Sequence, residues 1–211
     1  MKAKTESAEK TRKNLLAAAT NVIRTKGYTA TTVDDLCSYA GVTKGGFFHH
    51  FKSKEDLAIQ ATEFFAKMAQ GLFSGAEYNL EKDPLDKLLG YIDLRKNILQ
   101  GELYEYTCLL GTLVQETYST SPAIRAACRK HMDEHIAEIT KLVSDAKSAH
   151  CPDSDWSAES VAAFTQSVLQ GSFILAKAQD SPLVASESVS HLKNYIKSLF
   201  ANTDTKTNTT H

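Results

Sequence analysis

The chain lacks any apolar stretch that approaches the roughly 18 residues needed to cross a bilayer. Residues 1–13 are polar and lysine-rich, without the apolar centre of a secretory signal. The four cysteines, Cys37, Cys108, Cys128 and Cys151, form no CxxC pair. A chain of this length does not need disulfides to fold, so reduced thiols are expected. These absences favour a cytoplasmic protein.

Recognisable catalytic motifs are also lacking. The chain contains no nucleophile elbow, phosphate-binding loop or HExxH helix. Cys108 with Glu116 and a histidine would be an isolated set rather than a catalytic pattern. Cys128, His131 and His135 lie at helical spacing and could present metal ligands on one face. Apolar residues share that face, which favours ordinary packing. We therefore expect no enzyme activity, no bound metal and no resident cofactor.

What the sequence does contain is helical periodicity almost throughout, with no strand-type alternation. Apolar residues recur at three- and four-residue spacing before Gly27, and Thr32 and Thr43 can cap two short helices. A fourth helix follows Ser53. After a polar connection from Gly71 to Pro84, longer helices are predicted at 85–99, 103–118, 122–149, 157–179 and 186–200. The predicted fold class is all-α.

Charge is distributed unevenly between the two ends of the chain. Residues 1–54 contain ten Lys and Arg but four Asp and Glu, whereas the whole chain has a net charge of −1. A basic head on an acidic body indicates that the head contacts a polyanion. We predict a three-helix domain at 1–54 that binds the polyanion, a larger helical domain at 55–200, and a disordered tail at 201–211.

The segment 31–57 carries the strongest functional signal. Its two short helices flank a turn that contains Gly41, the geometry of a helix-turn-helix. The sequence Thr-Thr-Val at 31–33, Ala-Gly-Val-Thr-Lys-Gly at 40–45 and His-Phe-x-Ser-Lys-Glu at 50–55 closely resembles the DNA-binding domain of the TetR family of repressors. The resemblance is specific over residues 10–57. Elsewhere it rests on the number and length of the helices.

The resemblance implies a set of DNA contacts. Thr43 and Lys44 would bind DNA at the start of the recognition helix, and Gly45 and Gly46 would let the backbone approach closely. The groove would be faced by Phe47, Phe48 and His49, and phosphates would be gripped by Thr32, His50 and Lys54. Many members have Tyr in place of Phe48, which cannot donate that hydrogen bond. From the residues alone, the core is favoured over a DNA contact for Phe47 and Phe51, and His50 could pack on the first helix.

The resemblance also implies a homodimer and an effector site in the larger domain. Apolar stripes on the last two helices would form the dimer interface, and the alternative is that they pack only within one chain. They comprise Phe164, Val168, Gly171, Ser172, Leu175, Leu192, Tyr195, Ile196 and Leu199. Tyr104, Cys108, Thr112 and Gln115 would share one face of a single helix, a mixture suited to a small-molecule cavity. The expected effector pocket consists of Phe65, Met68, Tyr104, Cys108, Thr112, Gln115 and Phe164.

Cys108 begins a Cys-Leu-Leu-Gly segment that is similar to one in TetR members that respond to reactive electrophiles through a cysteine. A reactive thiol requires a nearby cation or a helix N-terminus, and neighbouring Glu105 would oppose ionisation, so a structural cysteine is the alternative. The predicted function is a ligand-responsive repressor that binds a palindromic double-stranded operator as a homodimer and is released by a small effector. A DNA-binding regulator without a ligand is the competing interpretation.

Overall fold

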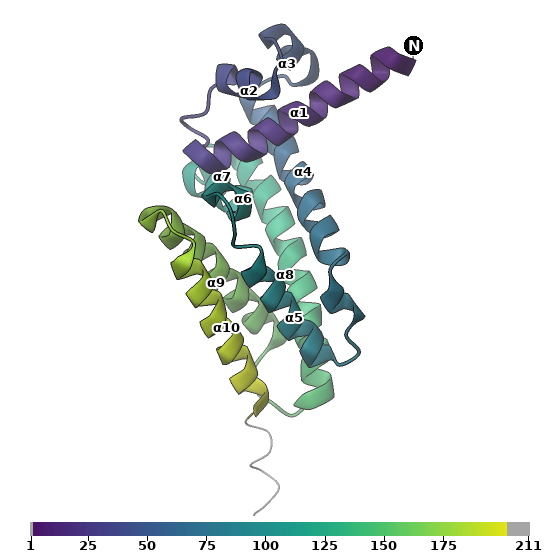
Figure 1. Cartoon of the computed structure of the whole chain (residues 1–211), viewed down its shortest axis with the longest axis vertical. Coiled ribbons are helices and arrows are strands. Elements are labelled where there is room, and N and C mark those ends of the chain that lie inside the picture. The colour runs from purple at the N-terminus through teal and green to yellow at the C-terminus, as the bar shows by residue number, and fades with distance from the viewer. Residues whose placement is uncertain (1, 202–211) are drawn as a thin grey trace, which may run out of the picture. The chain divides into compact units, whose positions relative to one another are not determined.

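The computed structural model describes residues 2–201, and every regular element in this range is a helix (Figure 1). The first elements are α1 (Lys2–Lys26), α2 (Val33–Ala40), α3 (Lys44–His50), α4 (Lys54–Ser74) and the 3-10 helix η1 (Glu77–Leu80). They are followed by α5 (Pro84–Asn97), α6 (Leu103–Tyr106), α7 (Leu109–Thr117), α8 (Pro122–His150), α9 (Ala158–Gln179) and α10 (Leu183–Ala201). The all-α prediction is confirmed. None of these helices is long and apolar enough to span a membrane.

These helices form two compact units that do not follow the predicted division at residue 54. Unit 1 comprises residues 1–71 and 107–132, and unit 2 comprises 72–106 and 133–211. The predicted head is thus packed with α7, with most of α4 and with the start of α8. Ala201 closes α10, and residues 202–211 of the predicted tail lie outside the described residues.

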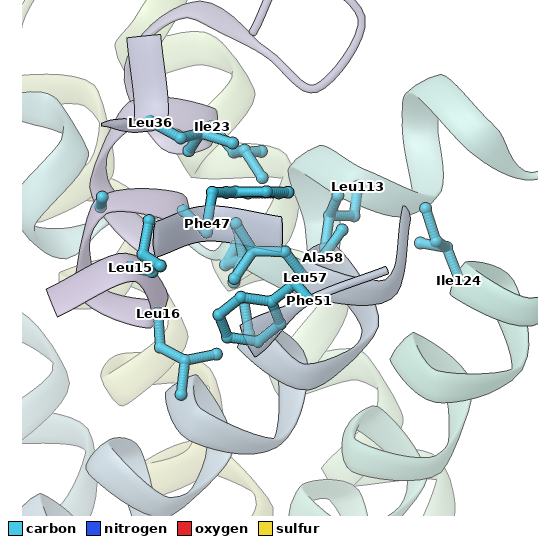
Figure 2. Packing of buried hydrophobic residues seen from close by; sticks show 14 of the residues in the cluster. Leu15, Leu16, Ile23, Leu36, Phe47, Phe51, Leu57, Ala58, Leu113 and Ile124 are labelled. Atoms are coloured by element: carbon cyan, nitrogen blue, oxygen red, sulfur yellow. The ribbon is translucent and has the colours of Figure 1, made fainter. Parts of the chain in front are cut away.

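The core of unit 1 joins segments that are far apart in the sequence. Figure 2 shows Leu15, Phe47, Phe51 and Leu57 pointing toward one another from α1, α3 and α4. Leu113 of α7 belongs to the same buried cluster. Each of these side chains is at most 1% exposed. Burial of a large apolar side chain stabilises a fold by about 1.5–3 kcal/mol, so this cluster fixes where α3 lies.

Unit 2 is organised around the packing of α9 with α10 and of α10 with α5. Asp83 caps α5 by accepting from the backbone N–H groups of Leu85 and Asp86, at 2.7 and 3.2 Å. Lys193 of α10 donates to both carboxylate oxygens of Asp93 at 2.6 Å. The unit therefore has its own core and its own polar ties between helices.

The structure corrects two predicted elements. The helix predicted at 103–118 is two helices, because residues 107 and 108 leave the helical conformation and Cys108 is the N-cap of α7. The segment 71–84, predicted as a connection, contains the last turn of α4 and all of η1. Asn79 explains the second difference, since its side chain donates to the carbonyls of Phe73 and Ala76 and closes this segment into a compact turn.

Candidate nucleic-acid interface

The entry to the helix-turn-helix is fixed by a complete capping box. Thr32 Oγ1 accepts from the backbone N–H of Asp35 at 3.1 Å, and the Asp35 carboxylate accepts from the backbone N–H of Thr32 at 2.7 Å. Lys26 at the end of α1 lies 2.6 Å from the same carboxylate. Its hydrogen bonds from Lys26 and Thr32 hold the pKa of Asp35 well below its usual range. The predicted cap at Thr32 is present in the structure.

The turn between α2 and α3 depends on a left-handed residue. Gly41 has φ +66°, and its N–H bonds back to the carbonyls of Cys37 and Ser38. A side chain would be strained in this conformation, so glycine suits the position. Thr43 then caps α3 by accepting from the N–H of Gly46 at 3.1 Å. Two local caps therefore set how α3 leaves the turn.

α3 presents one buried and one exposed face. Phe47 is fully buried and packs edge-to-face on Phe48, with ring centroids 5.0 Å apart. The placement of Phe47 among the groove-facing side chains is therefore wrong, because its ring fills the core (Figure 2). Phe48 is 57% exposed, and His49 is exposed as well. The exposed face of α3 thus combines an aromatic ring, an imidazole and backbone that glycine leaves without side chains.

Lys44 is available at the surface and has a carboxylate beside it. Its Nζ lies 2.9 Å from Asp34 Oδ1, and the two side chains are 62% and 69% exposed. A pair this exposed contributes little stability and can be broken by a stronger anion. An added Cβ at neighbouring Gly45 would meet only Thr43 Oγ1, at 3.8 Å, so protein packing does not require glycine there. This end of α3 is open to an approaching backbone.

Lys54 and His50, two residues predicted to contact phosphates, are partly enclosed by other parts of the chain. Lys54 donates to the carbonyls of Tyr28 and Thr31 at 3.0 and 2.9 Å, and its Nζ lies 4.3 Å from the Tyr28 ring centroid. Two donors of its amine therefore hold the turn after α1, and the contact of Lys54 with phosphate stays a prediction. Burial lowers the pKa of Lys54. His50 is half-buried, and burial, aided by His49 and Arg12, lowers its pKa and favours the neutral ring.

Glu116, which the sequence suggested only as part of an isolated set with Cys108, holds the same turn from a distance. Glu116 of α7 accepts from the backbone N–H of Tyr28 at 2.9 Å and of Thr29 at 2.8 Å. An added Cβ at Gly27 would lie 2.6 Å from the same carboxylate, and Gly27 has φ +88°. No local pattern reveals this contact, because its partners are separated by almost ninety residues. Arg24 also reaches far, donating to the carbonyl of Thr107 at 3.1 Å.

The residues expected to form the effector pocket divide between the two units. Phe65, Met68, Cys108, Thr112 and Gln115 belong to unit 1, whereas Tyr104 and Phe164 belong to unit 2. The break before α7 means that Tyr104 does not share a helical face with Cys108, which corrects that prediction. Thr112 and Gln115 bond to carbonyls of their own segment, at 3.1 and 3.0 Å. Phe65 packs against the unit 1 core, and Met68 is 51% exposed.

The predicted dimer surface separates into buried and exposed residues. Ser172, Leu192 and Ile196 are buried within the chain, so they are not available to a partner. The helices pack through these positions, as the alternative interpretation allowed. Phe164, Leu175 and Tyr195 remain 42–48% exposed, while Val168, Gly171 and Leu199 are half-buried. Ile174 of α9, which was not predicted from the sequence, is 49% exposed.

Comparison with known proteins agrees with this geometry. Residues 15–61 match the family described as bacterial regulatory proteins, tetR family, and residues 84–184 match a transcriptional regulator LmrA/YxaF-like C-terminal domain. The HTH-type transcriptional repressor DhaR of Mycobacterium sp. (strain GP1) is 24% identical over 79% of this chain and 82% of its own length. The repressor NemR of Escherichia coli (strain K12) is 27% identical over 67% of this chain and 71% of its own.

Solved structures show the same fold. A TetR-family regulator from Agrobacterium tumefaciens has a TM-score of 0.79 at 18% identity, covering 89% of this chain and 98% of that one. The reduced form of E. coli NemR has a TM-score of 0.72 at 25% identity, covering 87% and 96%. The fold and the helix-turn-helix define a DNA-binding transcriptional regulator. The chain belongs to the TetR family, whose members bind DNA operators, act as dimers and are not enzymes.

Proposed function

We propose that this protein is a repressor that binds a palindromic operator as a homodimer and leaves it when a small effector binds. The observation that carries the proposal is the exposed face of α3, where Lys44, Phe48 and His49 stand clear of the core. The similar proteins DhaR and NemR are both named as repressors, which supports repression in this chain. A twofold dimer would present two such faces and therefore favour an inverted repeat.

Selection of bound duplexes from random DNA tests the operator proposal. The expected result is an enriched inverted repeat whose half-sites lie about one helical turn apart or a multiple of it. Substituting Lys44 or His49 should reduce that enrichment, whereas substituting Lys141, an exposed lysine of unit 2 paired with Asp145, should not. Enrichment of an unrepeated site, or of no sequence at all, would contradict the proposal.

The exposed residues of α9 and α10 are the proposed dimer surface. Phe164 and Tyr195 pack edge-to-face with centroids 4.9 Å apart, and an added Cβ at Gly171 would meet nothing within 4 Å. Aromatic rings beside an open glycine would let a second chain approach closely. The surface therefore consists of Phe164, Val168, Gly171, Ile174, Leu175, Tyr195 and Leu199.

A matched pair of substitutions on α10 tests this surface. Tyr195→Glu places a charge on the apolar face, whereas Lys197→Glu changes an exposed residue two positions away, which points to the other side of the helix. Sedimentation should show a monomer for Tyr195→Glu and a dimer for Lys197→Glu, with similar melting temperatures. A dimer in both variants would place the interface elsewhere.

A reactive electrophile is a specific candidate effector, because Cys108 occupies the N-terminus of α7. Its Sγ accepts from the backbone N–H of Gly111 at 3.5 Å, and the thiol is half-buried rather than enclosed. The positive end of a helix stabilises a negatively charged sulphur, which is the attacking form. The Glu105 carboxylate accepts from the backbone N–H of Glu102 at 2.8 Å.

The same helix offers a route from Cys108 to the DNA-binding turn within unit 1. Cys108 begins α7, and Glu116 near its other end holds the N–H groups of Tyr28 and Thr29. Alkylation of the thiol would displace the Gly111 contact and bias α7 toward another position, which is sufficient for regulation if DNA favours only one position. The similar E. coli NemR structure is named as a reduced form, which supports a redox-dependent state in that relative.

Treatment with N-ethylmaleimide tests the electrophile response. Wild-type protein should lose operator affinity, Cys108→Ser should bind DNA and keep its affinity, and Cys151→Ser, at a buried cysteine of unit 2, should respond like wild type. An unchanged response in Cys108→Ser would make Cys108 a structural residue. Insensitivity of every variant to every tested reagent and metabolite would favour a regulator without a ligand.

A further inference from the structure

Arg95 in unit 2 lies against two aromatic rings, and no ion pair between it and a carboxylate is found among the described residues. Arg95 of α5 has its Cζ 5.3 Å from the Phe73 ring centroid and 6.0 Å from that of Phe173. Its Nε is buried and has no hydrogen-bond partner among the described residues. Buried donors are almost always bonded, and buried charges are almost always paired, so an unbonded guanidinium nitrogen here requires an explanation.

A second unsatisfied donor belongs to a tyrosine whose ring lies near Phe173. The Tyr106 hydroxyl is buried without a partner in the part of the chain that the structure describes, and the Tyr106 and Phe173 ring centroids are 6.3 Å apart. The amide oxygen of Gln166 on α9 is also buried without a partner among the described residues, but it is an acceptor and would not bind an anion. The two unsatisfied donors, Arg95 Nε and the Tyr106 hydroxyl, each destabilise the fold while they remain unbonded.

His135 and Tyr91, which lie near Arg95, are hydrogen-bonded to each other and uncharged. The His135 ring stacks on Phe73 with centroids 4.9 Å apart, and its Nε2 lies 3.1 Å from the Tyr91 hydroxyl. Burial, with Arg95 nearby, lowers the pKa of His135 to about 4, and burial raises the pKa of Tyr91 to about 12. Both groups are therefore neutral at pH 7, and neither neutralises the guanidinium.

We propose that the cluster around Arg95 binds a small organic carboxylate with an apolar or aromatic body. The fork formed by Nε and an adjacent Nη matches the two oxygens of a carboxylate, and Tyr106 supplies a second donor. Phe73 and Phe173 border the guanidinium with apolar rings, so the body of a ligand bound beside Arg95 would be apolar or aromatic. The binding claim stands on unit 2 alone, whereas the role of this acid as an effector rests on the proposed function.

Calorimetry on the full-length protein without DNA tests the site with defined probes. Benzoate and phenylacetate are the acids, and benzamide and phenylacetamide are neutral molecules of the same shape. At least one acid should bind, and its amide should bind about 30-fold more weakly or not at all, because the amide leaves the buried charge unpaired. Absence of binding by both acids up to about 10 mM, or equal binding of acid and amide, would overturn the proposal.

Substitutions separate recognition from structure. Arg95→Gln should weaken acid binding about 30-fold, whereas Arg125→Gln, at an exposed arginine of unit 1, should leave it unchanged. Tyr106→Phe removes only an unbonded hydroxyl, so it should preserve or raise the melting temperature while weakening acid binding. This variant keeps the test valid if Arg95→Gln does not fold. Acid binding that neither variant reduces would place the ligand elsewhere.

A gel-shift assay on the selected operator then separates the two proposals. If the acid binds and lowers operator affinity, it is an effector of the proposed repressor. If wild-type protein binds its operator but no acid, the carboxylate site is wrong and the repressor function stands. If it binds the acid but no DNA, the repressor function is wrong and the site stands.

Discussion

Lys44→Ala should weaken operator binding mainly at low salt. Lys44 is the exposed cation on the first turn of α3, and a dimer would place two copies on the duplex. Each neutralised phosphate contributes about 0.9 to the slope of log affinity against log salt, so two contribute about 1.8. Between about 50 and 200 mM salt, wild-type protein should lose about 12-fold more affinity than the variant.

Removing the charge of the neighbouring carboxylate should have the opposite effect on operator affinity. Asp34 pairs with Lys44 in the free protein and would repel phosphate, so Asp34→Asn should tighten binding. An exposed pair costs about 0.5 kcal/mol to break, and two copies correspond to about 5-fold in affinity. Fluorescence anisotropy on specific and random duplexes at several salt concentrations measures both effects. An unchanged salt slope in Lys44→Ala would remove Lys44 from the phosphate contacts and refute this account of the interface.

Three further changes probe how the helix-turn-helix is held and how unit 2 responds to pH. Glu116→Gln replaces a charged acceptor of the Tyr28 and Thr29 N–H groups, so it should cost about 1 kcal/mol in urea unfolding and lower operator affinity. Thr32→Ala removes the cap of α2 and should cost about 1 kcal/mol in the same assay; an unaltered midpoint would contradict the capping role. His135 has a pKa of about 4 when folded against 6.5 as its ordinary value, so the unfolded chain binds an extra proton between these values. The free energy of unfolding should therefore fall by about 3 kcal/mol as the pH drops from about 6.5 to 4, and His135→Phe should lose this dependence.

The sequence predicted the elements whose signals are local. Thr32 and Thr43 lie three residues before the N–H groups that they cap, and Gly41 occupies the left-handed turn position. Periodicity over long helices placed α8 and α9 within a residue of their observed ends. Periodicity gave the wrong result at Cys108, where the apolar pattern continues although the helix is interrupted between α6 and α7. The break coincides with the contact between the Thr107 carbonyl and Arg24, which is distant in the sequence.

Residue type and spacing by themselves determined the all-α class, the helix-turn-helix and the exposed Lys44, because caps, turns and amphipathic faces act over a few residues. Only the tertiary structure decided which side chains remain available. It buried Phe47 and occupied Lys54 with the carbonyls of Tyr28 and Thr31. It also left Arg95 Nε without a hydrogen-bond partner within residues 2–201. Burial and long-range pairing depend on segments that meet only in the folded chain, so they cannot be predicted from the local sequence pattern.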